Sequence, residues 1–365
     1  MPTNSSKVKI TSNRRDELDG LKGVACFVVF IYHMLLSLFC FSQDQDNVIL
    51  DVLVNTILNG YFMVFVFATI SGWLAYTGLP NSFMGTVRKS FKRYFKFALL
   101  FLISNFLIFA MSRTIGFHSA EIGECIHNTW LSGYYNSPMT ITGAIVQAVT
   151  IRSSFNGPLW VMPALILAPS MIYVFSWIYD LKVGLLEKHI IIGIIATASL
   201  IAVYILPFSE GVPFAMIASY IGALMHKYED TVNKIMRMYN IPIIGGGICI
   251  YIIAIIVGMG DIQNLLMTIP ASIVACEALY VKRIKNFFSQ KILIKASSIS
   301  LAVYILHWPI FCSIGLYLLM TLGLNDNYAI HAMIVIAVTT PICILGSWFF
   351  HNTIERFVNF AVKKV

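Results

Sequence analysis

Charged residues are scarce in this sequence. Only 12% of its 365 residues are Asp, Glu, Lys or Arg, whereas 58% are hydrophobic. A soluble domain has about 25% charged and about 45–50% apolar residues, so the composition predicts an integral membrane protein. A short apolar segment followed by a small-residue cleavage site is also lacking near the N-terminus. We therefore expect no removable signal peptide, and the first helix acts as its own insertion signal.

Several motifs of soluble enzymes are missing as well. The sequence has no HExxH, GxSxG, P-loop or GxGxxG motif, so it does not support a soluble-type hydrolase or nucleotidase. The cysteines show no paired spacing, and all but Cys125 lie in apolar segments, where a cysteine behaves as a small hydrophobic residue. We expect neither disulfide bonds nor a metal site.

Long apolar runs are what the sequence has instead. Nine are long enough to cross a bilayer, at roughly 17–25 residues each, and a shorter one follows at 212–226. They predict an all-α integral membrane protein with about ten transmembrane helices in a single domain, 1–365, with no appended soluble domain. A further apolar stretch, 139–151, is too short to cross and is expected to lie in or against the membrane. The nine runs fall at 24–41, 57–78, 94–111, 158–179, 189–206, 241–258, 262–281, 298–320 and 330–350.

The basic residues gather on one side of this ten-helix topology. Of 25 Lys and Arg residues, 23 fall on the side that holds both termini, and only Arg113 and Arg152 fall on the other. Because positively charged loops stay in the cytoplasm, both termini are expected there, including the tail 1–16. The net charge of +8 then reflects orientation and contact with anionic lipids rather than nucleic-acid binding.

The first span contains a lysine and a histidine on one helix face. In DELDGLKGVACFVVFIYHMLLSLFCF (16–41), Lys22 and His33 are eleven residues apart, which corresponds to about 16 Å along one side of a helix. An ionisable residue deep in a membrane span is a functional candidate, because burying it without a partner is costly. The alternative is a neutral histidine that forms a hydrogen bond between helices.

Five cations precede the third span, in VRKSFKRYFK (87–96). They fall within about 140° on a helical wheel. Such a face suits a phosphorylated ligand, since Arg and Lys bind phosphate strongly. The alternative is that the side chains extend into the lipid headgroup layer. The five residues are Arg88, Lys89, Lys92, Arg93 and Lys96.

Two further segments contain polar or aromatic residues of interest. In SISLAVYILHWPI (298–310), Ser300, Tyr304 and His307 share one helix face, which predicts an interior lining. His331 and His351 lie near the ends of spans and are expected only to meet water. The longest external segment, 112–157, is rich in aromatic residues. These residues suit contact with a sugar or, alternatively, an interfacial aromatic belt.

Together these segments resemble the acyltransferase-3 family of multi-pass bacterial membrane acyltransferases. RRDELDGLKGVACFVVFIYH is similar to the family's opening, with Lys22 and His33 as its Arg/Lys-x10-His pair. FATISGWLAY resembles the family's second span and contains Ser71, and NGPLWVMPAL resembles a later block and contains Trp160. SSISLAVYILHWPI and NTIERF are similar to its closing motifs. The resemblance covers nearly the whole chain.

The chain departs from the family pattern before the third span. The family has Arg-x-x-Arg there. If Arg93 is the second arginine, Ser90 stands at the first position, and Lys89 with Lys92 is the other register. Lys96 replaces the proline that usually follows.

The resemblance implies an O-acetyltransferase of the bacterial cytoplasmic (inner) membrane. It would move an acetyl group from cytoplasmic acetyl-CoA to a sugar hydroxyl of a surface polysaccharide, such as the O-antigen of lipopolysaccharide, or of a lipid-linked glycan. His33 is expected to be catalytic, either as the general base or as the first acceptor of the acetyl group. The residues expected to bind the donor are Lys22, Arg88, Lys89, Lys92 and Arg93. Those expected to line or brace the cavity are Ser71, Trp160, Ser300, Tyr304 and His307.

A polytopic transporter or a flippase for lipid-linked sugars is the alternative function, because buried histidines also occur in proton-coupled transporters. The Lys-x10-His pair and the cytoplasmic cations favour the enzyme, since an acyl-CoA enzyme needs such cations and a flippase does not. Another acyl group, such as succinyl, is a further alternative on the same scaffold.

Overall fold

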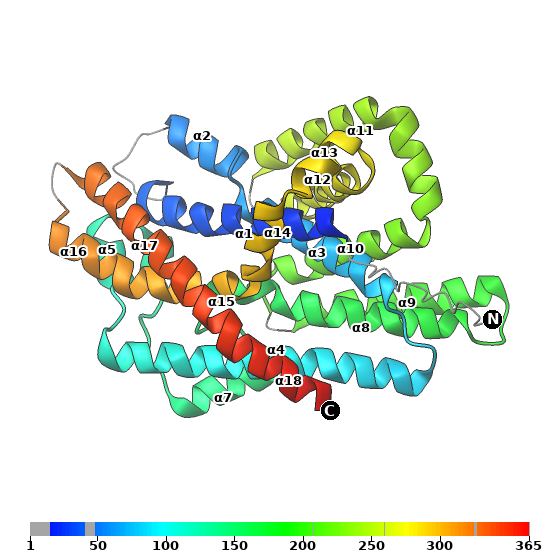
Figure 1. The fold of residues 1–365 in the computed structure, drawn as a ribbon, viewed down its shortest axis with the longest axis horizontal. Coiled ribbons are helices and arrows are strands. Elements are labelled where there is room, and N and C mark those ends of the chain that lie inside the picture. The colour runs from blue at the N-terminus through cyan, green and yellow to red at the C-terminus, as the bar shows by residue number, and fades with distance from the viewer. Residues whose placement is uncertain (1–14, 41–47, 207, 259, 325–326, 365) are drawn as a thin grey trace, which may run out of the picture.

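The structure, a computed structural model, describes residues 15–40, 48–206, 208–258, 260–324 and 327–364 (Figure 1). All regular elements in these ranges are helices. In chain order they are α1 (Asp16–Leu35), η1 (Leu36–Cys40), α2 (Val48–Thr56), α3 (Gly60–Thr77), α4 (Phe83–Thr114), α5 (Ser119–Cys125), α6 (Thr129–Ser132), α7 (Ile141–Thr150), η2 (Gly157–Val161), α8 (Met162–Tyr179), α9 (Leu185–Ile205), α10 (Gly211–Lys227), α11 (Glu229–Val257), α12 (Asp261–Tyr280), α13 (Lys282–Phe288), α14 (Lys291–Ser298), α15 (Ser300–Ile310), η3 (Phe311–Gly315), α16 (Leu316–Leu322), α17 (Tyr328–Phe350), η4 (His351–Glu355) and α18 (Arg356–Lys364).

The predicted all-α membrane architecture is confirmed. Nine helical segments of the described residues are long and apolar enough to cross a membrane, and each overlaps one of the nine long apolar runs. The tenth predicted run forms α10, whose 17 residues give a length of about 25 Å. The cytoplasmic placement of both termini stays a prediction, and most of the tail 1–16 lies outside the described residues.

Three helices extend well beyond the apolar runs that predicted them. α4 begins at Phe83, where the Ser82 hydroxyl accepts a hydrogen bond from the Gly85 amide at 3.1 Å, so the cationic stretch belongs to this helix. α11 loses helical geometry at Tyr239, because Pro242 lacks an N–H and its ring crowds the preceding turn. α17 continues through the π-helical turn η4 into α18.

The predicted external segment 112–157 is folded into the short helices α5, α6 and α7. Asn128 anchors it to the first span: its side chain caps α6 through the Leu131 amide and donates to the Ser37 carbonyl at 2.8 Å. α7 packs against α4 and leaves Ile145 and Val149 exposed. The place of 139–151 in or against the membrane stays a prediction.

Close helix packing holds the centre of the bundle. α1 contacts α3, α12, α14 and α15, and Figure 1 shows it surrounded by helices from both ends of the chain. Where α3 meets α10, a methyl group on Gly72 would collide with the Ser219 carbonyl, and one on Gly222 with the Thr69 carbonyl. Small residues allow such close approach of membrane helices.

Candidate active site

The two histidines deep in the predicted spans meet between α1 and α15. His33 Nδ1 lies 3.0 Å from His307 Nε2, and the ring centroids are 5.1 Å apart. The rings therefore meet edge to edge, as an N–H···N hydrogen bond requires. His307 is 1% exposed, whereas His33 is only partly buried. The sequence predicted both residues as interior, and the structure brings them into direct contact.

Aromatic side chains lie around His33. The Trp130 ring is 6.1 Å from the His33 ring and nearly parallel to it, and the Trp308 ring is 5.7 Å away. Tyr134 packs on Trp308 at 4.7 Å. Burial raises the pKa of the Tyr134 hydroxyl, so this ring is neutral. We call Trp130, Tyr134 and Trp308 the aromatic wall, two of whose members come from the predicted external segment.

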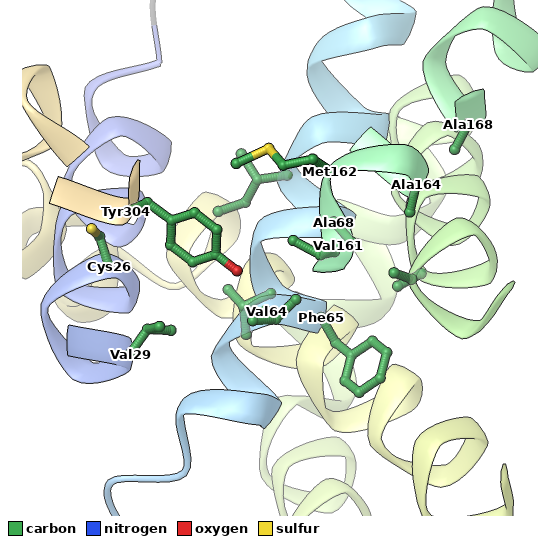
Figure 2. Close-up of a cluster of buried hydrophobic side chains, with 14 of the residues drawn as sticks. Cys26, Val29, Val64, Phe65, Ala68, Val161, Met162, Ala164, Ala168 and Tyr304 are labelled. Carbon is green, nitrogen blue, oxygen red and sulfur yellow. The ribbon is translucent and has the colours of Figure 1, made fainter. Parts of the chain in front are cut away.

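A cavity of about 270 Å³ lies among α1, α3, α4, α8 and α15. Its polar lining consists of Lys22, Ser71, Ser300 and Tyr304, and the rest is apolar. Figure 2 shows Tyr304 pointing from α15 toward Val161 and Met162, two of the apolar lining residues. The structure therefore gathers four of the predicted site residues, from the three helices α1, α3 and α15, around one cavity.

Arg93 reaches the edge of this cavity from α4. Its Nε donates to the Leu165 carbonyl at 2.6 Å, and one Nη donates to the Ser71 hydroxyl at 3.0 Å. Both partners line the cavity. Arg93 is therefore fixed between α3 and α8, with its charge next to a space large enough for a ligand group.

The other predicted donor-binding cations differ in their surroundings. Lys89 lies one turn before Arg93, with its ammonium 5.0 Å from the centre of the Tyr173 ring. Lys22 pairs with Asp19 at 2.6 Å. Arg88 is exposed and Lys92 is half-buried, and neither lines the cavity. The predicted cationic face is thus divided between an inward part, Lys89 and Arg93, and an outward part.

Tyr304 lies between the cavity and the histidine pair. It lines the cavity, and its ring centroid is 5.9 Å from that of His307. Its hydroxyl donates to the Pro158 carbonyl at 2.6 Å. The sequence left open whether this residue lines the cavity or braces the fold, and in the structure it does both.

Trp160 and Ser300 complete the predicted set. Trp160 stacks on Tyr61 at 5.1 Å and is not part of the cavity lining. Ser300 lines the 270 Å³ cavity and also a second cavity of about 1020 Å³ among α1, α14, α15 and α17.

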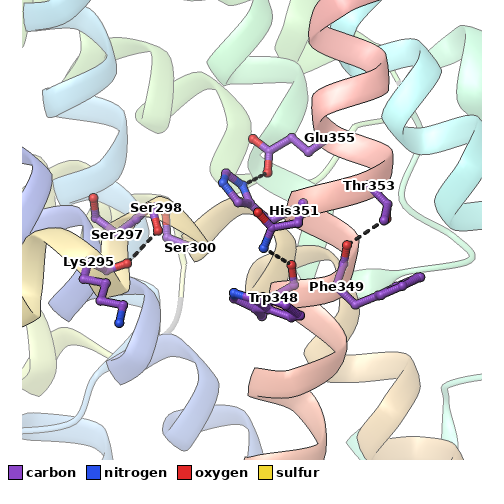
Figure 3. Close-up of polar contacts among 10 residues, drawn as sticks. Lys295, Ser297, Ser298, Ser300, Trp348, Phe349, His351, Thr353 and Glu355 are labelled. Atoms are coloured by element: carbon purple, nitrogen blue, oxygen red, sulfur yellow. Dashed lines mark hydrogen bonds and ion pairs between the residues drawn. The ribbon is translucent and has the colours of Figure 1, made fainter.

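His351 lies beside the second cavity. Figure 3 shows His351 and Glu355 across from Lys295 and Ser298, and His351 and Lys295 both line the cavity. His351 Nδ1 is 2.8 Å from Glu355 Oε2, and His331 Nδ1 is 2.9 Å from the Gly323 carbonyl. The expectation that these histidines only meet water is wrong, because the Glu355 carboxylate in the same turn η4 and the Gly323 carbonyl at the end of α16 lie within hydrogen-bond distance of their rings.

Among the described residues, no group of three or more His, Cys, Asp and Glu side chains could hold a metal ion. The arrangement instead offers an imidazole as base or nucleophile and two cations near a cavity. Imidazole can accept a proton or an acyl group near neutral pH.

A family comparison identifies the class of protein. The family model described as an acyltransferase domain, of the acyltransferase-3 family, matches residues 15–349. The chain belongs to the acyltransferase-3 family. No curated protein and no solved structure matched it. The protein is therefore a multi-pass membrane acyltransferase, and the matched region includes the histidine pair, the cavity and Arg93.

Some residues around this candidate site were not singled out by sequence reasoning. Trp308 is fully buried beside His33, and Asn156, also buried, donates to the Ile305 carbonyl at 2.7 Å. Trp308 directly follows His307, and Asn156 stands just before the block that contains Trp160. The sequence signal that could have found these two residues is their place directly beside a recognised motif.

Proposed function

We propose that the protein is an O-acetyltransferase of a bacterial inner membrane. It would transfer an acetyl group from cytoplasmic acetyl-CoA to a sugar hydroxyl of a surface polysaccharide, of the O-antigen type. Membership of the acyltransferase family supports acyl transfer. The observation that carries the finer proposal is the order of groups through the interior: Lys22 and Arg93, the 270 Å³ cavity, Tyr304, the histidine pair and the aromatic wall.

The donor half of the proposal rests on the cations beside the cavity. A guanidinium has five N–H donors and presents them in a planar fork that suits phosphate. Arg93 can therefore keep its contacts with Ser71 and Leu165 and still donate to a phosphate of CoA. Lys22 and Lys89 add positive charge nearby, and the apolar cavity suits the pantetheine arm.

The acceptor half rests on the aromatic wall. A sugar ring has apolar C–H faces that pack on aromatic rings, and the parallel Trp130 ring stands 6.1 Å from His33. In the predicted topology this wall belongs to the external side, opposite to the cations. Donor and acceptor would then approach His33 from opposite faces of the membrane, which gives a reason for a histidine in the middle of an apolar helix.

The proposed reaction needs one base. His33 takes the proton of the sugar hydroxyl while the hydroxyl oxygen bonds to the thioester carbonyl carbon. The carbon–sulfur bond breaks, and the CoA thiolate receives the proton from His33, so that the products are an acetyl ester and free CoA. In the other order, His33 bonds first to the acetyl carbonyl carbon while the carbon–sulfur bond breaks and the CoA thiolate leaves. The sugar hydroxyl oxygen then bonds to that carbon, the carbon–nitrogen bond to His33 breaks, and the hydroxyl proton passes to the CoA thiolate. General base catalysis contributes about 10²–10⁴ in rate.

Mass spectrometry of the host's surface polysaccharide tests the proposal. Strains with the gene, without it and with His33→Ala are compared, and the protein level in the membrane is measured in each. We expect the mass of one acetyl group per repeat only with the wild-type gene. An acetylated polysaccharide in the His33→Ala strain would contradict the assignment. Missing or shortened polysaccharide in the strain without the gene would instead support the flippase.

A further inference from the structure

The hydrogen bonds of the histidine pair determine where each proton lies. His307 Nδ1 is 3.0 Å from the Val303 carbonyl, and a carbonyl oxygen can only accept. His307 Nδ1 therefore carries a proton, and its Nε2 is the atom that faces His33 Nδ1. In a neutral imidazole one nitrogen donates and the other accepts, so a neutral His307 accepts from His33.

A charged His307 does not fit its surroundings. The ring is 1% exposed, and the ion pairs among the described residues do not include it. Loss of hydration makes an unpaired cation unfavourable in such a buried position. With His307 neutral, His33 Nδ1 must be the donor, and the His33 lone pair lies on Nε2.

His33 Nε2 is also the atom left for a substrate. It takes part in none of the hydrogen bonds formed among the described residues, and its side chain is only partly buried. The hydrogen bond at one nitrogen of a histidine fixes the protonation of the other. Resting on the proposed function, we infer that His307 is a positioning residue: it holds His33 in the Nδ1–H tautomer, so that Nε2 is the reacting base or nucleophile.

The same contact serves the reaction itself. When His33 Nε2 takes the hydroxyl proton, an N–H bond forms, an O–H bond breaks, and His33 becomes a cation. Its Nδ1–H then donates to the neutral His307 Nε2, and a hydrogen bond from a charged donor is roughly twice as strong as a neutral one. His307 therefore supports the charged state without leaving its bond to Val303.

Two substitutions separate this role from simple packing. In His307→Gln the amide oxygen can take the place of Nε2 as acceptor, whereas His307→Leu removes the acceptor and keeps the apolar contacts. We expect kcat to fall less than about tenfold for His307→Gln and about 10²–10⁴-fold for His307→Leu, with KM for acetyl-CoA unchanged in both. His331→Leu is the matched control, since His331 also bonds a backbone carbonyl but lies outside the site.

The tautomer is read directly by ¹⁵N NMR of histidine-labelled protein in lipid nanodiscs, with His33→Asn used to assign the signal. We expect an unprotonated Nε2 in the wild type and in His307→Gln, and a protonated Nε2 in His307→Leu. A protonated Nε2 in the wild type would overturn the inference, as would equal losses of kcat in folded His307→Gln and His307→Leu. The NMR result needs no substrate, so it distinguishes failure of this inference from failure of the proposed reaction.

Discussion

Two helices of equal hydropathy occupy opposite places in the bundle. In each of the spans that contain α1 and α9, an 18-residue apolar stretch has a mean hydropathy of 1.9, yet 67% of that stretch is buried in the first span and 6% in the second. α1 contains His33, whose ring forms a hydrogen bond with His307 on α15. The histidine of α9, His189, bonds only the Leu185 carbonyl of its own helix. Hydropathy thus predicts that a helix crosses the membrane, and polar residues within the span indicate that it lies at the centre.

Replacing the central histidine should have the largest effect. We expect His33→Ala to lower the rate of acetyl transfer about 10³-fold, because the base or nucleophile is lost. His189→Ala, at the periphery, should leave the rate unchanged. Release of CoA by the purified protein in nanodiscs measures both. Similar losses in the two variants would mean that the position of the helix in the bundle does not decide the role of its histidine.

The inward and outward cations of α4 allow the same comparison within one helix. Arg93→Met should raise KM for acetyl-CoA about 30-fold, since a hydrogen bond to a charged group contributes about 1.5–3 kcal/mol. Arg88→Met removes an exposed charge and should change KM less than about threefold. Steady-state kinetics at fixed ionic strength gives both values. Equal increases in KM would show that binding of acetyl-CoA depends on the total positive charge at this end of α4 rather than on the position of the Arg93 guanidinium.

The contrast between centre and periphery also shows how far the sequence could predict the site. Periodicity placed Lys22 with His33 on one face and Ser300 with Tyr304 on another, and both helices are found. It could not predict that His33 and His307 touch, because that depends on the rotation of α1 against α15. For the same reason it could not separate Lys89 and Arg93 from Arg88: a helical wheel does not show which part of the cationic face turns toward α8.

The close contact of α3 with α10 predicts a difference in stability. A methyl group on Gly72 would meet the Ser219 carbonyl, whereas one on Gly245, in the peripheral helix α11, would meet nothing within 4 Å. We expect Gly72→Ala to lower the free energy of unfolding by about 2 kcal/mol through overpacking. Gly245→Ala should leave it equal or raise it by up to about 1 kcal/mol, because alanine favours a helix. Thermal unfolding in one detergent compares the two, and a stable Gly72→Ala would contradict the close packing.

The smallest effect is expected for two tyrosine hydroxyls that make comparable hydrogen bonds. Tyr304 donates to the buried Pro158 carbonyl at 2.6 Å, and Tyr204 donates to Asp261 at 2.9 Å from an exposed position on α9. Tyr304→Phe leaves a buried carbonyl without its donor and should cost about 1 kcal/mol of unfolding free energy. Tyr204→Phe should cost nothing measurable, since water replaces the lost partner. If the Tyr304 hydroxyl only braces η2, the short helix before α8, kcat stays within about threefold of wild type while stability falls. A loss of kcat without a loss of stability would mean instead that this hydroxyl, on the cavity side of His307, takes part in the transfer.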